Sequence, residues 1–383
     1  MEWKEVTLGE IAIFKTGKLN SNAAISNGEY PFFTCSPETL RINSYAFDQE
    51  AILLAGNNAE GNFSIKYYKG KFNAYQRTYV ITPIRGKVDI KFLYYALSLC
   101  LKQLKNMSQG TSTKFLTVTI LNSFSVKLPS ISDQRRIASI LSSLDRKIEL
   151  NNKINADLEE MAQAIFKNWF VDFEPFKDGK FVDSELGMIP EGWKVGRLTD
   201  VIKLMPGGTP KTSEPLYWDN GTIPFFSPKD VNGVYCFATE KHITETGLNK
   251  CSSNLYPKDT IFITCRGTVG KVCLAACDMA MNQSNYAIKA IDGYSQYYVF
   301  FLVKSVVERL IKKSNGAVFS AITSKDFDEE ILIPSQKAVE DFTNVIDGFF
   351  RRIFTIGTES SRLSTLRDTL LPRLMSGELE VPE

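Results

Sequence analysis

A stretch without proline or glycine, from Gln134 to Phe170, restricts the middle of this chain to one kind of structure. Within it, mostly apolar positions recur in alternating steps of four and three residues, which is the heptad pattern of a coiled coil. These positions are Ile137, Leu141, Leu144, Ile148, Asn151, Asn155, Leu158, Ala162, Ile165 and Trp169. A helix of this length extends about 55 Å at roughly 1.5 Å per residue. We therefore predict a long helical spacer.

A helix with one apolar stripe needs a second helix to cover it, and the stretch from Gln336 to Met375 has the same periodicity. Asn151 and Asn155 interrupt the first stripe, where buried amides weaken the pairing and fix its register. Two ordinary long helices inside one globular core are the alternative to a paired spacer. The second stripe consists of Val339, Phe342, Ile346, Phe349, Ile353 and Ile356, and, after a polar break at Glu359 and Ser360, of Leu363, Leu366 and Leu370.

The sequence repeats itself at an offset of about 190 to 210 residues, which is the signature of a duplicated architecture. Matched residues include Trp3 and Trp193, Pro31-Phe32-Phe33 and Pro224-Phe225-Phe226, Gln76 and Gln283, Leu128-Pro129 and Ile333-Pro334, and Gln134 and Gln336. The predicted order is therefore a globular segment, a long helix, a second globular segment and a second long helix.

Both globular segments contain short runs of β-branched and aromatic residues, separated by turn formers and followed by one helix. The predicted fold class is α+β, with two similar mixed α/β domains separated by two long helices packed as an antiparallel coiled coil. The first segment has such runs at 30–34, 51–55, 63–68 and 78–83 and a helix at about 90–104, and the second has runs at 223–226, 260–264 and 285–291 and a helix at about 296–313. The predicted boundaries are 1–128 for the first domain, 129–185 for the first spacer helix and its connector, 186–332 for the second domain, and 333–383 for the second spacer helix and the tail.

The 383 residues are 44% hydrophobic and 23% charged, a composition typical of a globular protein with two or more domains. The start has no apolar signal core, and no segment approaches the roughly 18 apolar residues that span a bilayer, so we expect a cytoplasmic protein. The net charge of +2 is distributed as +6, −3, +1 and −2 over the four predicted segments. The more basic globular segments suit contact with a polyanion.

Motifs for catalysis do not stand out. His242 is the only histidine, so a Ser-His-Asp or Cys-His mechanism would depend on this one residue, which we place in the loop before Leu248. Residues 266–271 contain a G-x-x-G-K run that is too short for a phosphate loop and predict a tight turn instead. Neither the Pro-Pro of an amino-methyltransferase signature nor a nuclease-like acidic cluster is found. The seven cysteines lack paired spacing, although Cys265, Cys273, Cys277 and His242 could be imagined around zinc.

The remaining candidates are polar loop residues of the kinds that contact base edges and phosphates, and they recur at matched places in both copies. Taken singly, each one is better interpreted as an ordinary solvated loop residue, so the prediction rests on their recurrence in both copies. The candidates of the first domain are Lys15, Thr16, Lys18, Asn57, Asn58, Gln76, Arg77, Gln109, Thr111, Ser112 and Lys114. Those of the second domain are Gly207, Gly208, Thr209, Lys211, Lys229, Arg266, Asn282, Gln283, Asn315 and Ser320. The sequence therefore predicts a binding protein without an active site of its own.

Four further stretches carry a resemblance to a known family. They are FKNWFVDFEPF (166–176), SELGMIPEGW (184–193), MPGGTP (205–210) and LLPRLMSGELEV (370–381). With the duplicated plan, they make the chain resemble the DNA specificity subunit of Type I restriction-modification systems over essentially its full length. The first domain departs from the pattern, because it has KTGKLN where the second has MPGGTP.

The resemblance implies two target recognition domains, each of which recognises one half of a split, asymmetric DNA sequence. It also implies that the helix pair sets the spacing between the halves, and that two modification and two restriction subunits bind as partners of the chain on double-stranded DNA. No cofactor is expected on this chain. S-adenosylmethionine would bind the modification subunit, and ATP and Mg the restriction subunit. A coiled-coil scaffold that binds proteins, and a methyltransferase-nuclease fusion, are the rival interpretations.

Overall fold

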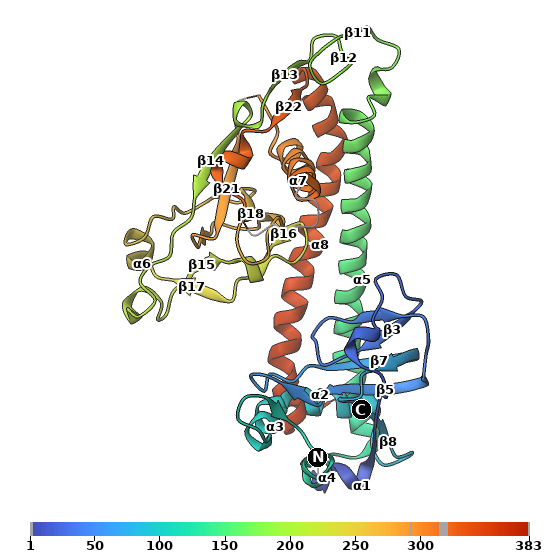
Figure 1. Cartoon of the computed structure of the whole chain (residues 1–383). Helices are drawn as coiled ribbons and strands as arrows, with labels where there is room; N and C mark the ends of the chain where they lie inside the picture. Colours follow the sequence, from blue (N-terminus) through green and yellow to red (C-terminus); the bar gives the residue numbers. More distant parts are fainter. Residues whose placement is uncertain (1–2, 292, 314–320, 382–383) are drawn as a thin grey trace. The chain divides into compact units, whose positions relative to one another are not determined.

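Residues 3–291, 293–313 and 321–381 are described in the computed structural model. The chain divides into two units, Met1–Arg146 with Ser364–Glu383, and Lys147–Leu363. Each unit therefore contains one globular part together with segments of both long helices (Figure 1). The predicted boundaries treated those helices as segments of their own, whereas their packing divides each helix between the two units.

A six-stranded sheet with the order β2-β8-β5-β7-β3-β4 forms the centre of the first unit. Its neighbouring strands are antiparallel except β3 and β7. The strands are β2 (Ala12–Thr16), β3 (Tyr30–Phe33), β4 (Leu40–Ile42), β5 (Phe47–Ala55), β7 (Ile65–Ala74) and β8 (Thr78–Pro83). Two small sheets accompany it, β1 (Lys4–Thr7) with β10 (Ser125–Leu128) and β6 (Asn57–Asn58) with β9 (Lys114–Phe115).

Helices cover the core of the first unit. They are α1 (Leu8–Ile11), α2 (Ile90–Leu99), α3 (Leu101–Met107) and α4 (Val118–Ser123). The single helix predicted at 90–104 is interrupted at Cys100, so it forms α2 and α3. Asp89 starts α2, because its carboxylate accepts hydrogen bonds from the backbone N–H groups of Lys91 and Phe92.

The second unit repeats this plan with a five-stranded sheet of order β14-β21-β18-β19-β16 and a three-stranded sheet of order β17-β15-β20. The strands are β14 (Ile202–Pro206), β15 (Ile223–Phe226), β16 (Tyr235–Cys236), β17 (Lys241–Ile243), β18 (Ile261–Thr264), β19 (Val272–Ala275), β20 (Ala280–Met281) and β21 (Asn285–Ala290). Further elements are α6 (Glu245–Asn249), α7 (Gln296–Lys313), and β13 (Lys194–Arg197) paired with β22 (Glu330–Ile333). The β13–β22 pair matches the β1–β10 pair of the first unit, so the predicted duplication is confirmed in the fold.

Both long helices begin after a Pro-Ser pair. The proline disfavours helical backbone at the residue before it, and the serine caps the first turn of the helix. The helices are α5 (Ile131–Phe170) and α8 (Gln336–Ser376). The Ser130 hydroxyl accepts a hydrogen bond from the Asp133 backbone N–H, and the Ser335 hydroxyl accepts one from the Ala338 N–H. The predicted helical stretches therefore exist and start close to their expected residues.

Contacts between α5 and α8 have reversed order along the two helices, so the helices are antiparallel (Figure 1). Within the second unit, the Asn155 amide donates to the Ile353 carbonyl at 3.3 Å, and the Asn151 amide donates to Glu359 at 2.8 Å. The hydrogen bond from Asn151, followed by the one from Lys147, lowers the pKa of Glu359. Within the first unit, Arg367 pairs with Asp145 at 2.8 Å. The predicted α+β class with an antiparallel helix pair is confirmed.

The predicted stripe residues lie buried or half-buried, with one exception. On α5 they are Ile137, Leu141, Leu144, Ile148, Asn151, Asn155, Leu158, Ala162, Ile165 and Trp169, and on α8 they include Val339, Phe342, Ile346, Phe349 and Ile353. The expectation for Leu366 was wrong, because its side chain is 46% exposed. Its neighbour Arg367 takes the inward place and reaches Asp145.

The connector after α5 is an ordered part of the second unit. β11 (Phe181–Val182) pairs with β12 (Ile189–Pro190). Phe170, Phe173 and Phe176 surround Trp193, with ring centroids 5.2 to 5.8 Å apart. These aromatic side chains are therefore packed together as expected for residues that are unfavourable in water. None of the described helices is long and apolar enough to cross a membrane.

Two glycines of α8 provide a matched test of its packing. A Cβ at Gly357 would lie 2.2 Å from the Phe237 ring, whereas one at Gly348 would meet nothing within 4 Å. Gly348→Ala should raise the free energy of unfolding by up to about 1 kcal/mol, because alanine favours a helix. Gly357→Ala should lower the thermal unfolding midpoint, because the extra methyl group overpacks the site. Equal stabilisation by both substitutions would contradict this packing.

Candidate nucleic-acid interface

Three loops of the first unit lie at the same end of its sheet, where strands β2 and β5 end and strand β8 begins. β2 ends at Thr16, which pairs with Tyr79 near the start of β8, and β5 ends at Ala55, which pairs with Thr78. The residues that follow or precede these strand ends are 17–20, 56–58 and 75–77. We call them, with Lys15 and Thr16, the first loop edge. This edge brings together seven of the predicted candidates: Lys15, Thr16, Lys18, Asn57, Asn58, Gln76 and Arg77.

Backbone hydrogen bonds hold the first loop edge together. The Gly56 N–H donates to the Arg77 carbonyl at 2.8 Å, and the Gln76 N–H donates to the Leu19 carbonyl at 2.9 Å. The Gln76 side-chain amide also donates to the Asn20 side-chain oxygen at 2.8 Å. Gly17 is required here, because a Cβ would lie 1.7 Å from the Ala74 carbonyl oxygen. The loops are therefore fixed relative to one another.

The loop SQGTSTKF joins the same edge through β6 and β9. Asn57 pairs with Phe115, Asn58 pairs with Lys114, and Gln109 bridges to Phe115. Thr111 and Ser112 lie in the exposed turn between Gln109 and Lys114. The Asn58 side-chain oxygen accepts from the backbone N–H groups of Glu60 and Asn62, so it shapes its own turn.

The second unit has a matching arrangement, which we call the second loop edge: residues 205–209, 265–266 and 282–284. β14 ends at Pro206 opposite Tyr286, and β18 ends at Thr264 opposite Asn285. The Cys265 N–H donates to the Ser284 carbonyl at 2.9 Å. A Cβ at Gly207 would lie 2.1 Å from the Asn282 carbonyl oxygen, and the Thr209 hydroxyl donates to the Gln283 side chain.

The hydrogen bonds define which residues correspond between the edges. In the first unit the Leu116 N–H donates to the Gly56 carbonyl, and in the second the Ile322 N–H donates to the Cys265 carbonyl. Asn57, which follows Gly56, therefore corresponds to Arg266, which follows Cys265 and bridges to Ala321. By the same pairing, Gly17 corresponds to Gly207, Gln76 to Gln283 and Arg77 to Ser284.

One exposed arginine therefore stands at each edge, but on a different loop. Arg77 occupies the position of Ser284, and Arg266 occupies that of Asn57. Neither guanidinium forms an ion pair with a carboxylate of the described residues. A guanidinium that is not paired with a carboxylate can form the paired hydrogen bonds that distinguish guanine, or contact a phosphate.

The other candidates have different surroundings. Lys15, Thr16 and Lys18 also line a cavity of about 620 Å³. Lys229 lies in a short 3-10 helix (Pro228–Asp230) after β15, and the Lys211 carbonyl accepts a hydrogen bond from the Trp218 indole. Asn315 and Ser320 lie outside the described residues. The sequence did not single out Asn20, whose contact with Gln76 joins residues far apart in the chain.

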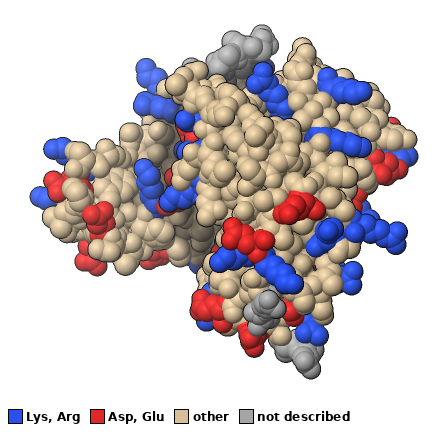
Figure 2. Space-filling model, turned by 90° about the horizontal axis from the view of Figure 1, so that it is seen from below, with Lys and Arg blue, Asp and Glu red and all other residues tan. Residues whose placement is uncertain are grey.

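Charges are interspersed on the face shown in Figure 2, where Lys and Arg side chains alternate with Asp and Glu. On this face, attraction for a polyanion would come from local groups rather than from a field of one sign. The expected loop position of His242 was wrong, because the residue lies in β17, where it is exposed and pairs with Pro224 of β15.

The zinc alternative finds no support in the part of the chain that is described, where no group of three potential ligands is close enough to hold a metal. Burial raises the pKa of Cys265 to about 12 and that of Cys273 well above its ordinary value. Burial therefore favours the protonated form of both thiols when no metal ion is bound.

Two units with related strand plans, each with a hydrogen-bonded polar loop edge, define a binding protein with two related recognition domains. The family model described as "Type I restriction modification DNA specificity domain" matches residues 1–160 and again residues 190–347. The chain belongs to this family of Type I specificity subunits. It is a non-catalytic subunit that recognises DNA sequence, and its partners are DNA and the methyltransferase and restriction subunits of such a system.

Individual relatives agree with this assignment. The chain is 31% identical to the EcoDI specificity subunit of Escherichia coli, over 99% of this chain and 89% of the relative. It is 30% identical to the MjaIX specificity subunit of Methanocaldococcus jannaschii, over 79% of this chain and 72% of the relative. The crystal structure of the S subunit from M. genitalium has the same fold, with a TM-score of 0.59 at 17% identity and coverage of 97% and 96%.

The two exposed arginines give a direct test of the loop edges. Arg77→Ala or Arg266→Ala should weaken binding to target DNA by about 1 to 3 kcal/mol with relaxed specificity if the side chain contacts a base. A phosphate contact would instead give a loss on all sequences and a shallower salt dependence. Fluorescence anisotropy on target and scrambled duplexes measures both.

Arg85→Ala is the matched control, because Arg85 is also exposed but lies beyond the opposite end of β8. Its loss should leave DNA affinity nearly unchanged. Unchanged affinity for both Arg77→Ala and Arg266→Ala would argue against the loop edges as DNA contacts.

Proposed function

We propose that the two loop edges recognise the two halves of one bipartite, asymmetric DNA target. The observation that supports this proposal is that the two loop edges have the same backbone hydrogen bonds but different side chains at corresponding positions. A common plan presents each edge in the same way, whereas Arg77 with Asn57 and Ser284 with Arg266 offer different donors and acceptors. Two different half-sites are the expected consequence, because base identity is read by such groups.

The proposal assigns the spacing of the half-sites to α5 and α8. Each of these helices runs without interruption from residues of one unit into residues of the other. A helix lengthens by a fixed 1.5 Å or so per residue, and a base-pair step of duplex DNA is about 3.4 Å. Helix length and the number of unread base pairs between the half-sites are then linked.

Recruitment completes the proposed function. Two modification subunits and two restriction subunits assemble on the chain and act at the DNA that it selects, in the cytoplasm. S-adenosylmethionine binds the modification subunit, and ATP and Mg bind the restriction subunit. What supports this division is the family to which the chain belongs.

Lengthening the helix pair tests the proposed spacing. Seven residues inserted after Asn151 in α5, with seven more before Glu359 in α8, preserve the heptad register and add about 10 Å. The unread spacer should grow by about three base pairs while both half-sites stay the same. Methylome sequencing of cells that carry the altered complex measures this. Altered half-sites with an unchanged spacer would contradict the proposal.

The proposed division of labour is tested with purified components. The chain alone, freed of co-purified subunits, should neither methylate nor cut target DNA, because its part is recognition. Addition of the modification subunit and S-adenosylmethionine should restore methylation at both half-sites, measured by transfer of a labelled methyl group. Methylation by the isolated chain would refute the division.

A further inference from the structure

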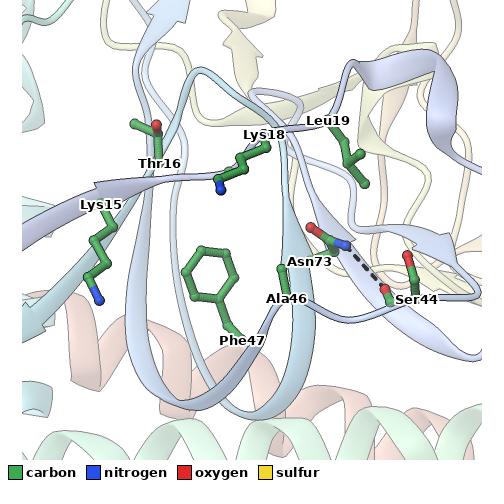
Figure 3. A pocket seen from close by; sticks show the side chains of 9 residues that line it. Lys15, Thr16, Lys18, Leu19, Ser44, Ala46, Phe47 and Asn73 are labelled. Atoms are coloured by element: carbon green, nitrogen blue, oxygen red, sulfur yellow. Dashed lines mark hydrogen bonds between the residues drawn. The ribbon is translucent and has the colours of Figure 1, made fainter.

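The two units differ at one place beside their loop edges. In the first unit a cavity of about 620 Å³ opens next to the Lys15–Leu19 loop (Figure 3). Its walls come from three separate segments: Lys15, Thr16, Gly17, Lys18 and Leu19; Ser44, Ala46 and Phe47; and Asn73. Figure 3 shows the Phe47 ring between the Lys15–Lys18 strand and Ala46.

The corresponding place in the second unit has different contacts. In the first unit Phe47 pairs with Phe72, and in the second unit Tyr256 forms a β-bridge with Met279. Both pairs are antiparallel, and they occupy the same place in their units, so Tyr256 is the counterpart of Phe47. The Tyr256 hydroxyl donates to the Pro206 carbonyl at 2.7 Å, and its side chain is 2% exposed. Phe47 lacks that hydroxyl, which in the second unit joins the aromatic ring to the end of β14.

A second contact lies beside the one made by Tyr256. A Cβ at Gly208 would lie 2.2 Å from the Ser252 hydroxyl oxygen and 2.7 Å from the backbone nitrogens of Ser252 and Ser253. The glycine loop of the second unit therefore packs directly on the segment that precedes Tyr256. Lys18, the counterpart of Gly208, instead borders the open cavity.

The cavity of the first unit is suited to a flat heterocycle with a nearby phosphate. Phe47 offers a half-buried aromatic face. The Asn73 side chain is 4% exposed; its amide donates to the Ser44 carbonyl at 3.3 Å, and its oxygen accepts from the Ala74 N–H. One amide N–H and one lone pair remain for a ligand. Lys15 and Lys18 place two exposed ammonium groups at the rim.

The cavity is continuous with the first loop edge. Leu19 lines it, bridges to Tyr75, and accepts the backbone hydrogen bond of Gln76. A nucleotide in the cavity would therefore lie beside Gln76 and Arg77, the side chains proposed to contact the first half-site.

We propose that this cavity receives one nucleobase of the first half-site, turned out of the duplex. The base stacks on Phe47 and hydrogen-bonds to Asn73, and Lys15 and Lys18 contact the flanking phosphates. Proteins that extrude a base hold it by such stacking and polar contacts in a pocket of this kind. This inference rests on the proposed DNA recognition, and it makes the two units unequal because Tyr256 of the second unit is joined to Pro206 where Phe47 of the first unit lines the cavity.

Phe47→Tyr tests the inference with one added hydroxyl, which would reach toward the end of β2 as Tyr256 reaches Pro206. The complex of the chain with its modification subunits should bind target duplex about tenfold more weakly, the loss expected for one stacked base. Tyr256→Phe is the matched control in the second unit and should change the affinity less than twofold. Unfolding midpoints of both variants by circular dichroism establish that they fold.

An abasic scan of the first half-site locates the base. One abasic position should weaken binding to the wild-type complex but not weaken it further in Phe47→Tyr, because both changes remove the same contact. Affinity of Phe47→Tyr equal to wild type would overturn the inference. Additive losses at every position would also overturn it.

A free nucleotide has the same ring and phosphate as a nucleotide of DNA. Titration of the full chain with each deoxynucleoside monophosphate therefore tests whether the cavity binds a free nucleotide rather than a base of the DNA target. Binding of these probes that Phe47→Tyr abolishes, with unchanged DNA affinity, would mean a small-nucleotide site and would overturn the assignment to DNA. Failure of the wild-type complex to prefer its target duplex would instead count against the proposed function itself.

Discussion

The burial of one apolar stripe on each long helix is the constraint on which the rest of this structure depends. Neither stripe can remain in water, since burial of each large apolar side chain stabilises by about 1.5 to 3 kcal/mol. In the second unit, Phe342, Ile346 and Phe350 of α8 lie in one core with Phe166 and Phe170 of α5 and with α7. In the first unit, Ile137 and Leu141 of α5 share a core with Leu374 of α8 and with α2. The helices are thus part of both domain cores.

The cores, the strand pairs and the backbone hydrogen bonds together explain how the two domains can differ in their side chains without losing their fold. The apolar cores and the strand pairs β1–β10 and β13–β22 preserve the scaffold, while the loop edges are joined mainly by backbone hydrogen bonds. Because those bonds do not depend on side-chain identity, Arg77 can stand opposite Ser284, and Asn57 opposite Arg266. A recognition surface of this kind can change its chemistry while its frame is kept.

The sequence predicted the features that follow from local periodicity or from the repeat. The α7 range was predicted as Gln296–Lys313, and the long helices to within a few residues, because unbroken apolar spacing determines them. Contacts between distant residues carried no such signal. The exchange of Leu366 for Arg367 on the inward face depends on Asp145, and the contact of Tyr256 with the end of β14 depends on a hydroxyl that its counterpart Phe47 lacks. The structure brings most of the candidate residues into the two loop edges. The sequence pattern alone does not say which base any of them would contact.

The central claim is that each loop edge recognises a different half of one target. Site-specific photo-crosslinking tests it most directly, with a photoreactive amino acid placed at Gln76 in one variant and at Gln283 in another. After irradiation of each complex on target duplex, sequencing of the crosslinked strands gives the contacted bases. We predict crosslinks confined to one half-site from Gln76 and to the other half-site from Gln283. Crosslinks from both positions to the same half-site, or to the spacer, would contradict the claim.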